Sequence, residues 1–161
     1  MDIEAVIEKM KGNRNFVLQE TSGIPHISEK YVLPDDVIRF YTLCGGIECY
    51  VNGPAYPIRV LSPNEVVNAN MFLLGEEFED DISSCWHLIA DAYDGNYISV
   101  DCGQKHNGKC IESFEETYAL QDDSPIIAQS FTEFLEKLLQ YGGEGFYWLE
   151  DEFEGYGDAY Q

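Results

Sequence analysis

Apolar residues recur every three to four positions in three stretches of the chain, which is the spacing of one face of a helix. The predicted helices span residues 3–10, 33–44 and 130–141. Pro34 suits the first turn of the second helix because it has no N–H to leave unpaired, and Asp35 and Asp36 complement the positive helix end. The capping box Ser130–Glu133 starts the third helix, and glycine pairs end the last two.

Short runs rich in β-branched and aromatic residues alternate with turn signals through the middle of the chain. The predicted strands are residues 47–51, 56–61, 86–91, 97–101 and 110–114. A capping box at Ser62–Glu65 predicts a further helix that reaches about Met71, and residues 14–33 are expected to be irregular. Helices first, antiparallel hairpins next and a closing helix favour an α+β fold, with a mainly antiparallel sheet packed by helices.

The balance of charges narrows the possible partners. The chain has 30 acidic residues against nine Lys and Arg, for a formal net charge of -21. Residues 1–60 hold eight acids and six bases, whereas residues 61–161 hold 22 acids and three bases. This excess excludes binding to nucleic acid through its phosphates and disfavours an anionic membrane surface. It attracts basic proteins, although an acidic surface can also serve solubility alone.

Length and composition indicate a single folded domain, since 161 residues of which 45% are hydrophobic can enclose a core. Residues 1–10 lack the basic and apolar pattern of a leader, and no apolar run is long enough to span a membrane. The five cysteines form no dense, even-numbered framework. These features favour a reducing, cytoplasmic location.

Two acidic clusters are candidate partner-binding sites. In the predicted loop of residues 76–81, the candidates are Glu76, Glu77, Glu79, Asp80 and Asp81. At the C-terminus, aromatic and acidic candidates alternate: Tyr147, Trp148, Glu150, Asp151, Glu152, Phe153, Glu154 and Tyr156. Tyr and Trp anchor interfaces, and carboxylates select partners of opposite charge. The alternatives are a solvated loop at 76–81 and, at the C-terminus, a last strand at Phe146–Leu149 followed by a solvated tail.

No residue pattern indicates a metal, a cofactor or a catalytic site. Cys102, His106 and Cys110 are spaced four apart, but zinc sites usually contain a closer pair of cysteines, and Asn107-Gly108 splits the group as a turn. Asp91–Asn96 lacks the alternating ligands of a calcium loop. The chain has no nucleophile, P-loop or dinucleotide motif. A hydrolase acting through clustered carboxylates therefore ranks below a binding protein.

Three segments in this order resemble the SUKH superfamily, also called SMI1/KNR4-like. They are Leu33–Gly46 (LPDDVIRFYTLCGG), Trp86–Asp101 (WHLIADAYDGNYISVD) and Ser130–Leu139 (SFTEFLEKLL). The resemblance implies one domain over residues 1–143, followed by an acidic, aromatic extension over residues 144–161 that can belong to the same domain. The chain departs from the family pattern at Cys44-Gly45, where Asn-Gly is common, and in this extension.

The resemblance implies an α+β fold, no catalytic activity and a role in binding other proteins. Bacterial members are often immunity proteins that neutralise toxins, many of them nucleases, and eukaryotic relatives are regulatory binding proteins. A nuclease must be cationic to hold phosphates, so an acidic inhibitor suits it. We therefore expect an immunity protein that occludes a basic toxin domain with its acidic surface. The alternative is an intracellular scaffold or regulatory adaptor without a toxin partner.

Overall fold

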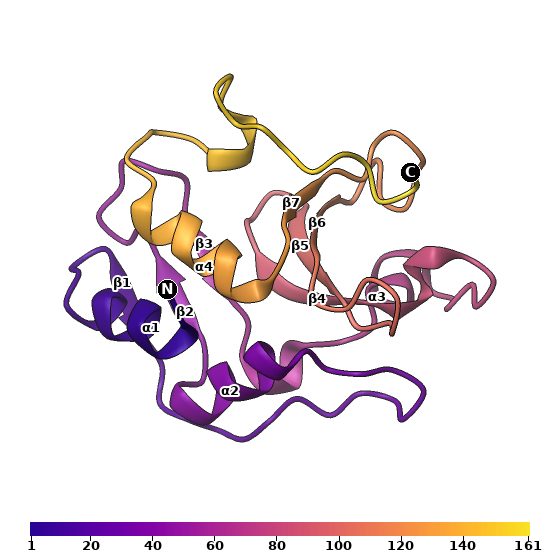
Figure 1. Ribbon diagram of the computed structural model, residues 1–161, viewed down its shortest axis with the longest axis horizontal. Helices are drawn as coiled ribbons and strands as arrows, with labels where there is room; N and C mark the ends of the chain where they lie inside the picture. The colour runs from indigo at the N-terminus through magenta and orange to yellow at the C-terminus, as the bar shows by residue number, and fades with distance from the viewer.

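Seven strands form one sheet in which every strand pairs antiparallel with the next strand along the chain (Figure 1). The computed structural model describes residues 1–161. The strands are β1 (Phe16–Leu18), β2 (Ile47–Cys49), β3 (Ile58–Val60), β4 (Trp86–Asp91), β5 (Asn96–Asp101), β6 (Cys110–Phe114) and β7 (Ile126–Ala128). The helices are α1 (Ile3–Lys11), α2 (Asp35–Leu43), α3 (Ala69–Leu74) and α4 (Phe131–Gln140), with 3-10 turns η1 (Pro63–Glu65), η2 (Ile82–Cys85) and η3 (Tyr147–Leu149). The predicted α+β fold is confirmed.

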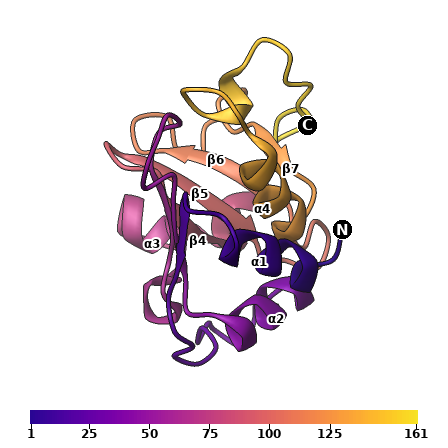
Figure 2. The ribbon, with the colours of Figure 1, turned by 90° about the vertical axis from the view of Figure 1, so that its left-hand side faces the viewer.

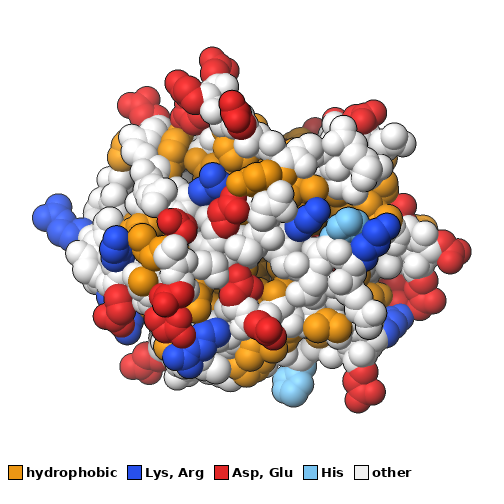
Figure 3. Space-filling model, in the orientation of Figure 1, with side chains coloured by type: hydrophobic (Ala, Val, Ile, Leu, Met, Phe, Trp, Pro, Cys, Tyr) orange, Lys and Arg blue, Asp and Glu red, His pale blue; other side chains and the backbone are white.

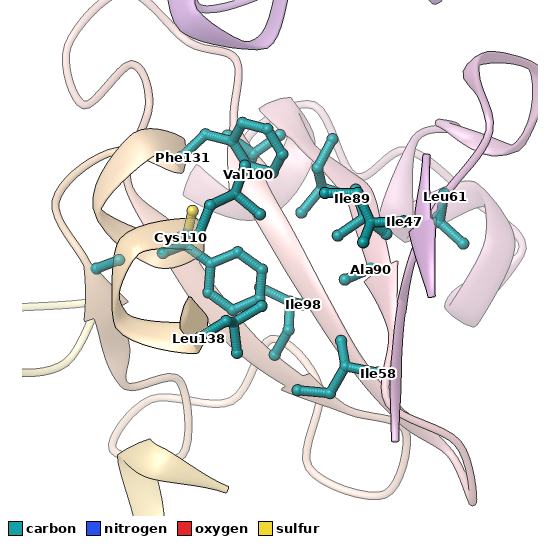
Figure 4. Close-up of a cluster of buried hydrophobic side chains, with 14 of the residues drawn as sticks. Ile47, Ile58, Leu61, Ile89, Ala90, Ile98, Val100, Cys110, Phe131 and Leu138 are labelled. Carbon is teal, nitrogen blue, oxygen red and sulfur yellow. The ribbon is translucent and has the colours of Figure 1, made fainter. Parts of the chain in front are cut away.

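The helices divide unequally between the two sides of the sheet. α1, α2 and α4 gather on one face, whereas α3 lies on the other side, next to β4 (Figure 2). Between the helices and the sheet, Phe131 and Leu138 of α4 share a core with Ile98 and Val100 of β5, and each is at most 1% exposed (Figure 4). Burying one such side chain contributes about 1.5–3 kcal/mol, so this layer holds the fold together. No helix combines the length and the apolar character needed to span a bilayer.

Two helix starts that the sequence predicts are linked in the structure. The Ser130 hydroxyl accepts a hydrogen bond from the Glu133 N–H at 3.0 Å and caps α4. Pro34 directly precedes α2, and Asp36 lies in its first turn. The Asp36 carboxylate accepts hydrogen bonds from the N–H and the hydroxyl of Thr132, both at 2.8 Å. The polar first turn of α2 therefore also holds the start of α4.

The single helix predicted over residues 62–71 is wrong. Only η1 forms at the capping box, where Arg59 holds Glu65 at 2.6 Å. The chain then extends, and the Val67 carbonyl accepts a hydrogen bond from the Leu88 N–H at 2.9 Å. This pairing with β4 replaces the bonds that a continuous helix would need, so α3 begins separately after it.

Two further differences from the sequence expectations concern the sheet edges. β1 lies in a segment expected to be irregular, and neither it nor β7 was predicted, because three residues are too few to show a period. The last strand predicted at residues 146–149 does not form; Tyr147–Leu149 form the turn η3. The segment after η3 instead returns to β7, where the Ile126 N–H donates to the Gly157 carbonyl at 2.9 Å. The C-terminal residues thereby cover an otherwise open sheet edge.

Candidate partner-binding surface

Residues 67–82 form a small lobe beside β4, which we call the α3 lobe (Figure 1). The lobe contains α3, the predicted acidic loop and the start of η2. Asn68 caps α3 by accepting a hydrogen bond from the Met71 N–H at 3.0 Å. Gly75 ends the helix with a φ of 81°, a left-handed conformation that glycine adopts without a steric penalty. The chain then turns back through the acidic residues toward β4.

One buried side chain fixes the α3 lobe to the rest of the protein. Asn70 is fully buried, and its amide group donates to the Glu77 carbonyl at 2.5 Å and to the Ser83 hydroxyl at 3.1 Å. Its carbonyl oxygen accepts a hydrogen bond from the Tyr118 hydroxyl at 2.6 Å. A buried amide with partners at both ends defines one position for the loop.

The α3 lobe exposes a group of large apolar side chains. Six of the 16 exposed large hydrophobic residues of the chain belong to it: Val67, Met71, Phe72, Leu74, Phe78 and Ile82. Phe72 is 56% exposed and meets Tyr97 edge to face, with ring centroids 5.6 Å apart. Phe78 is 49% exposed. Apolar side chains gathered on a surface are typical of a protein-binding site.

Exposed carboxylates accompany these apolar side chains. Glu76 and Asp80 are exposed and take part in no ion pair. Lys30 reaches across from another segment and binds Glu77 at 2.7 Å and Glu79 at 2.8 Å. These hydrogen bonds raise the pKa of the Lys30 ammonium, and the bond from Lys30 lowers the pKa of Glu79. Lys30 thus engages two of these acids, whereas Glu76 and Asp80 remain free for a partner.

The last acid of the loop connects the lobe to the C-terminus. Asp81 accepts hydrogen bonds from the Ser83 N–H at 3.0 Å and from the Tyr160 hydroxyl at 2.6 Å. Burial disfavours the charged form of Asp81, but the hydrogen bonds from Ser83 and Tyr160 outweigh burial and lower its pKa. Asp81 therefore serves the fold through these contacts.

Residues 144–161 are called the C-terminal segment. Two of the predicted partner anchors in this segment are part of the core. Tyr147 and Trp148 are each only 7% exposed. The Tyr147 hydroxyl donates to the Ile127 carbonyl at 2.8 Å, and the Trp148 ring stacks on Phe146 with centroids 4.6 Å apart. Both rings also lie beside Phe134 of α4. Burial against α4 leaves little of either ring for a partner, and the expectation that Tyr147 and Trp148 anchor one stays a prediction.

The remaining candidates of the C-terminal segment are more accessible. Phe153 is half-buried against the Tyr147 ring at 5.4 Å. Tyr156 is 38% exposed, and its hydroxyl donates to Glu133. The four acidic candidates of the segment are exposed: Glu150, Asp151, Glu152 and Glu154. This segment therefore offers carboxylates with little free aromatic surface beside them.

The structure does not join the two acidic clusters. In Figures 1 and 2 the loop of residues 150–154 projects at the top, whereas the α3 lobe lies at one side of the molecule. Figure 3 shows acidic side chains gathered at the top, where this loop projects, and others distributed toward the right edge and below. Of the two clusters, the α3 lobe has more exposed large apolar side chains beside its carboxylates, six against Leu149 and Tyr156 in the C-terminal segment.

The apolar part of the α3 lobe was missed in the sequence, although one signal pointed to it. Residues 71–74 are four consecutive apolar residues, Met-Phe-Leu-Leu, in a helix of only six residues. An amphipathic helix buries a single face, so four consecutive positions cannot all point inward. Such a run beside an acidic loop predicts exposed apolar side chains.

The cysteines and histidines weighed as metal ligands do not converge. No group of three or more His, Cys, Asp or Glu side chains is arranged to hold a metal ion. Cys102 and Cys110 are buried, and burial raises the pKa of both thiols. His106 is exposed on the turn between β5 and β6.

Comparisons with known proteins agree with the resemblance. Residues 28–137 match the model of the SMI1 / KNR4 family (SUKH-1). The chain is also similar to "Immunity protein YokJ" of Bacillus subtilis (strain 168), with 38% identity over 160 residues, which covers 99% of this chain and 96% of the relative. No solved structure matches the chain.

Proposed function

The chain belongs to the SMI1/KNR4 family (SUKH-1), and we propose that it is an immunity protein that binds and neutralises a cognate toxin in the cytoplasm. The observation that carries this proposal is the similarity to a named immunity protein along nearly the whole of both chains. The match includes the α3 lobe and the C-terminal segment, so it extends beyond residues 28–137.

The partner of this proposal is a basic toxin domain, and in particular a nuclease. A nuclease holds its substrate with cationic side chains, which an acidic protein can cover. The net charge of -21, of which residues 61–161 carry nearly all, favours such a partner. Neutralisation of this kind requires binding alone, so no catalytic group is assigned.

We assign the toxin contact to the α3 lobe. Glu76 and Asp80 supply long-range attraction, which raises the rate of association with a basic surface. Charge gives rate and specificity more than affinity, which depends on a few buried apolar anchors. Phe72 and Phe78 are suitable anchors because about half of each side chain is exposed before binding.

Co-expression in bacteria tests the proposed function. Toxin C-terminal domains, nucleases among them, are expressed with and without the full chain, and growth and complex formation are measured. We expect growth to be restored by one toxin domain and a stable complex with that domain. If no toxin domain is bound or neutralised, the regulatory adaptor role replaces this proposal.

Matched charge reversals test the assignment to the α3 lobe. The double variant Glu76→Lys/Asp80→Lys and the control Asp151→Lys/Glu152→Lys change the net charge equally, and all four side chains are exposed. We expect the lobe variant to slow association with the toxin domain at least about tenfold at low salt, and the control to slow it much less. Equal effects would mean that net charge alone steers the partner.

A further inference from the structure

A hollow of about 190 Å³ is lined by three aromatic residues from separate parts of the chain, and we call it the aromatic hollow. Tyr56 precedes β3, Tyr93 lies on the β4–β5 turn, and Phe146 precedes η3. Cavities that hold whole small molecules usually measure about 300–1,000 Å³. A hollow of this smaller size suits a single side chain of a partner.

Contacts within the chain hold the walls of the aromatic hollow in place. The Tyr56 N–H donates a hydrogen bond to the Gly145 carbonyl at 3.3 Å, and the Tyr56 ring meets Phe146 edge to face with centroids 5.2 Å apart. Phe146 is buried. The Tyr93 N–H donates to the Asp91 carboxylate at 2.8 Å. The hollow is therefore formed before a partner binds, which reduces the entropy cost of binding.

The tyrosine rings of the aromatic hollow are available to a partner. Tyr56 is 55% exposed and Tyr93 is 41% exposed. The three cation–π contacts of the chain place Lys30 and Lys137 over other rings, so no cation of the chain occupies these two. The face of an aromatic ring is negative and attracts a Lys or Arg side chain within about 6 Å of its centre.

The aromatic hollow also contains an unpaired carboxylate. Asp94 is exposed and takes part in none of the eight ion pairs of the chain. Arg59, on the neighbouring strand β3, is engaged elsewhere, since it binds Glu65 at 2.6 Å and lies 3.8 Å from Asp91. The lining contains no Lys, Arg or His. Nothing in the lining therefore offsets the negative charge of Asp94.

We propose that the aromatic hollow receives an arginine side chain carried on an exposed loop of the partner. The guanidinium would lie over the Tyr56 and Tyr93 rings and pair with the Asp94 carboxylate. Arginine stacks on aromatic faces and binds carboxylates through a planar fork of N–H groups, so it matches both features of the lining. Charge complementarity supports this occupant, because the lining has a carboxylate and no cation. That the partner is a toxin rests on the proposed function, whereas the chemistry of the hollow does not.

The aromatic hollow adds a specificity that surface charge alone does not give. The exposed acids of the chain attract any basic protein. A hollow for one side chain selects a partner that carries an arginine at the matching position. Asn96 of the lining is followed by Tyr97, whose ring contacts Phe72 of the α3 lobe. The hollow and the lobe therefore adjoin the same end of β5.

A peptide titration tests the aromatic hollow without any toxin. The probe is acetyl-Ala-Arg-Ala-amide, added to the full ¹⁵N-labelled chain at about 0.15 M salt, which screens attraction between exposed charges. The control peptide carries citrulline, a neutral side chain of nearly the same shape, in place of Arg. We expect the largest chemical-shift changes at residues 92–96 and 145–147, and at least about fivefold weaker binding of the citrulline peptide. No binding, equal binding of both peptides, or larger changes elsewhere would each overturn the proposal.

Two pairs of variants locate the groups responsible. Asp94→Asn and its control Asp151→Asn each remove one exposed carboxylate, and asparagine tolerates the left-handed conformation of Asp94, whose φ is 54°. Tyr56→Leu and its control Tyr156→Leu each remove one exposed aromatic ring. We expect each variant of the hollow to weaken binding of the Arg peptide at least about threefold, and each control to leave it within about 1.5-fold. Equal weakening by a variant and its control would overturn the assignment to this hollow.

The toxin domain gives a separate readout. If the wild-type chain neutralises no toxin, the proposed function fails while the peptide titration still decides the chemistry of the hollow. With a toxin domain that does bind, Asp94→Asn/Tyr56→Leu should lower the affinity at least about tenfold relative to Asp151→Asn/Tyr156→Leu. Undiminished affinity would overturn the place of the hollow in the interface.

Discussion

The α3 lobe and the C-terminal segment have similar compositions and opposite environments. Both combine aromatic or large apolar residues with runs of acids. In the C-terminal segment Tyr147 and Trp148 pack against α4, and the acids face solvent with only Leu149 and Tyr156 as exposed large apolar side chains. In the α3 lobe Phe72 and Phe78 face solvent together with the acids. Composition therefore does not distinguish a segment that packs on the core from one that is free to bind a partner. The position of each segment relative to the core does distinguish them.

The difference has a physical origin in what each segment lies beside. The C-terminal segment follows α4 directly and can cover apolar side chains that α4 leaves at its edge, such as Phe134. The α3 lobe lies on the less covered side of the sheet, and its short helix buries only Ala69 and Asn70. Aromatic residues that lie beside uncovered apolar side chains, such as those of α4, are buried against them. Aromatic residues on a helix with a small buried face, such as α3, stay exposed.

The largest expected effect that separates the two regions is on folding. Trp148→Ala should lower the free energy of unfolding by about 3–5 kcal/mol, because it leaves a cavity among stacked rings. Phe72→Ala should change it by about 0.5 kcal/mol or less, since Phe72 is mostly exposed. Chemical denaturation of both variants measures the two values. If Trp148→Ala does not fold, Trp148→Phe replaces it in the measurement. Comparable losses of stability at Trp148 and Phe72 would contradict the distinction between a buried and an exposed segment.

The second expected effect is on toxin affinity, which should depend on the α3 lobe more than on the C-terminal segment. Phe72→Ala should weaken toxin binding by about 2 kcal/mol, or about 30-fold, if Phe72 is an interface anchor. Leu149→Ala is the control in the C-terminal segment, because Leu149 is 65% exposed and offers a similar apolar side chain. Calorimetry with the purified toxin domain measures both affinities. A larger loss at Leu149 would move the interface to the C-terminal segment.

The third effect concerns how the lobe is held. Asn70→Ala should cost about 1–3 kcal/mol of stability, since it leaves the buried Tyr118 hydroxyl without its partner. The loss should be local, with faster hydrogen exchange at the amides of Gly75 and Asp81 than in β6. Asn52→Ala is the control, because Asn52 makes an exposed hydrogen bond to a backbone carbonyl. Uniformly faster exchange throughout the chain would show that Asn70 supports the whole fold.

Local sequence patterns predicted the elements that depend on neighbouring residues. Signals within a few positions of each other predicted the apolar faces of α1, α2 and α4, the Ser130 cap of α4 and the two central hairpins. The strands β1 and β7 and the break after η1 depend on pairing with distant segments, such as Val67 with Leu88. These features have no local signal, because the competing hydrogen bonds come from the folded sheet.

The sequence predicted the acidic residues of the candidate surface, but the exposed apolar side chains of the α3 lobe were not predicted. Runs of acids are visible in any sequence, and seven of the nine at 76–81 and 150–154 are exposed in the structure, Glu77 and Asp81 being the exceptions. Burial of an aromatic ring depends on whether tertiary neighbours leave room for it. Such neighbours bury Trp148, whereas Phe72 has only Tyr97 beside it and stays 56% exposed.

The smallest expected effect is a pH dependence that acts on the α3 lobe more than on the C-terminal segment. His87 of β4 is 2% exposed and pairs with Asn68 at the base of the lobe. Burial lowers its pKa below the usual 6.5, although the Cys85 carbonyl, Asp101 and Glu77 oppose this shift. The Tyr31 ring lies against it at 5.2 Å.

The sign of this pH dependence follows from the lowered pKa of His87. Above about pH 6.5 the imidazole is neutral in both the folded and the unfolded chain, and below that value the unfolded chain gains a proton first. Stability should therefore fall as the pH drops from 7 toward 5. The protection factor of the Gly75 amide, which corrects for the pH dependence of intrinsic exchange, should fall before that of the Gly157 region. Glu65, whose pKa Arg59 lowers to about 2, contributes its own loss only below about pH 4.5, so the two windows are separable. In His87→Gln the loss between pH 7 and 5 should shrink, and an unchanged loss would assign it to other groups.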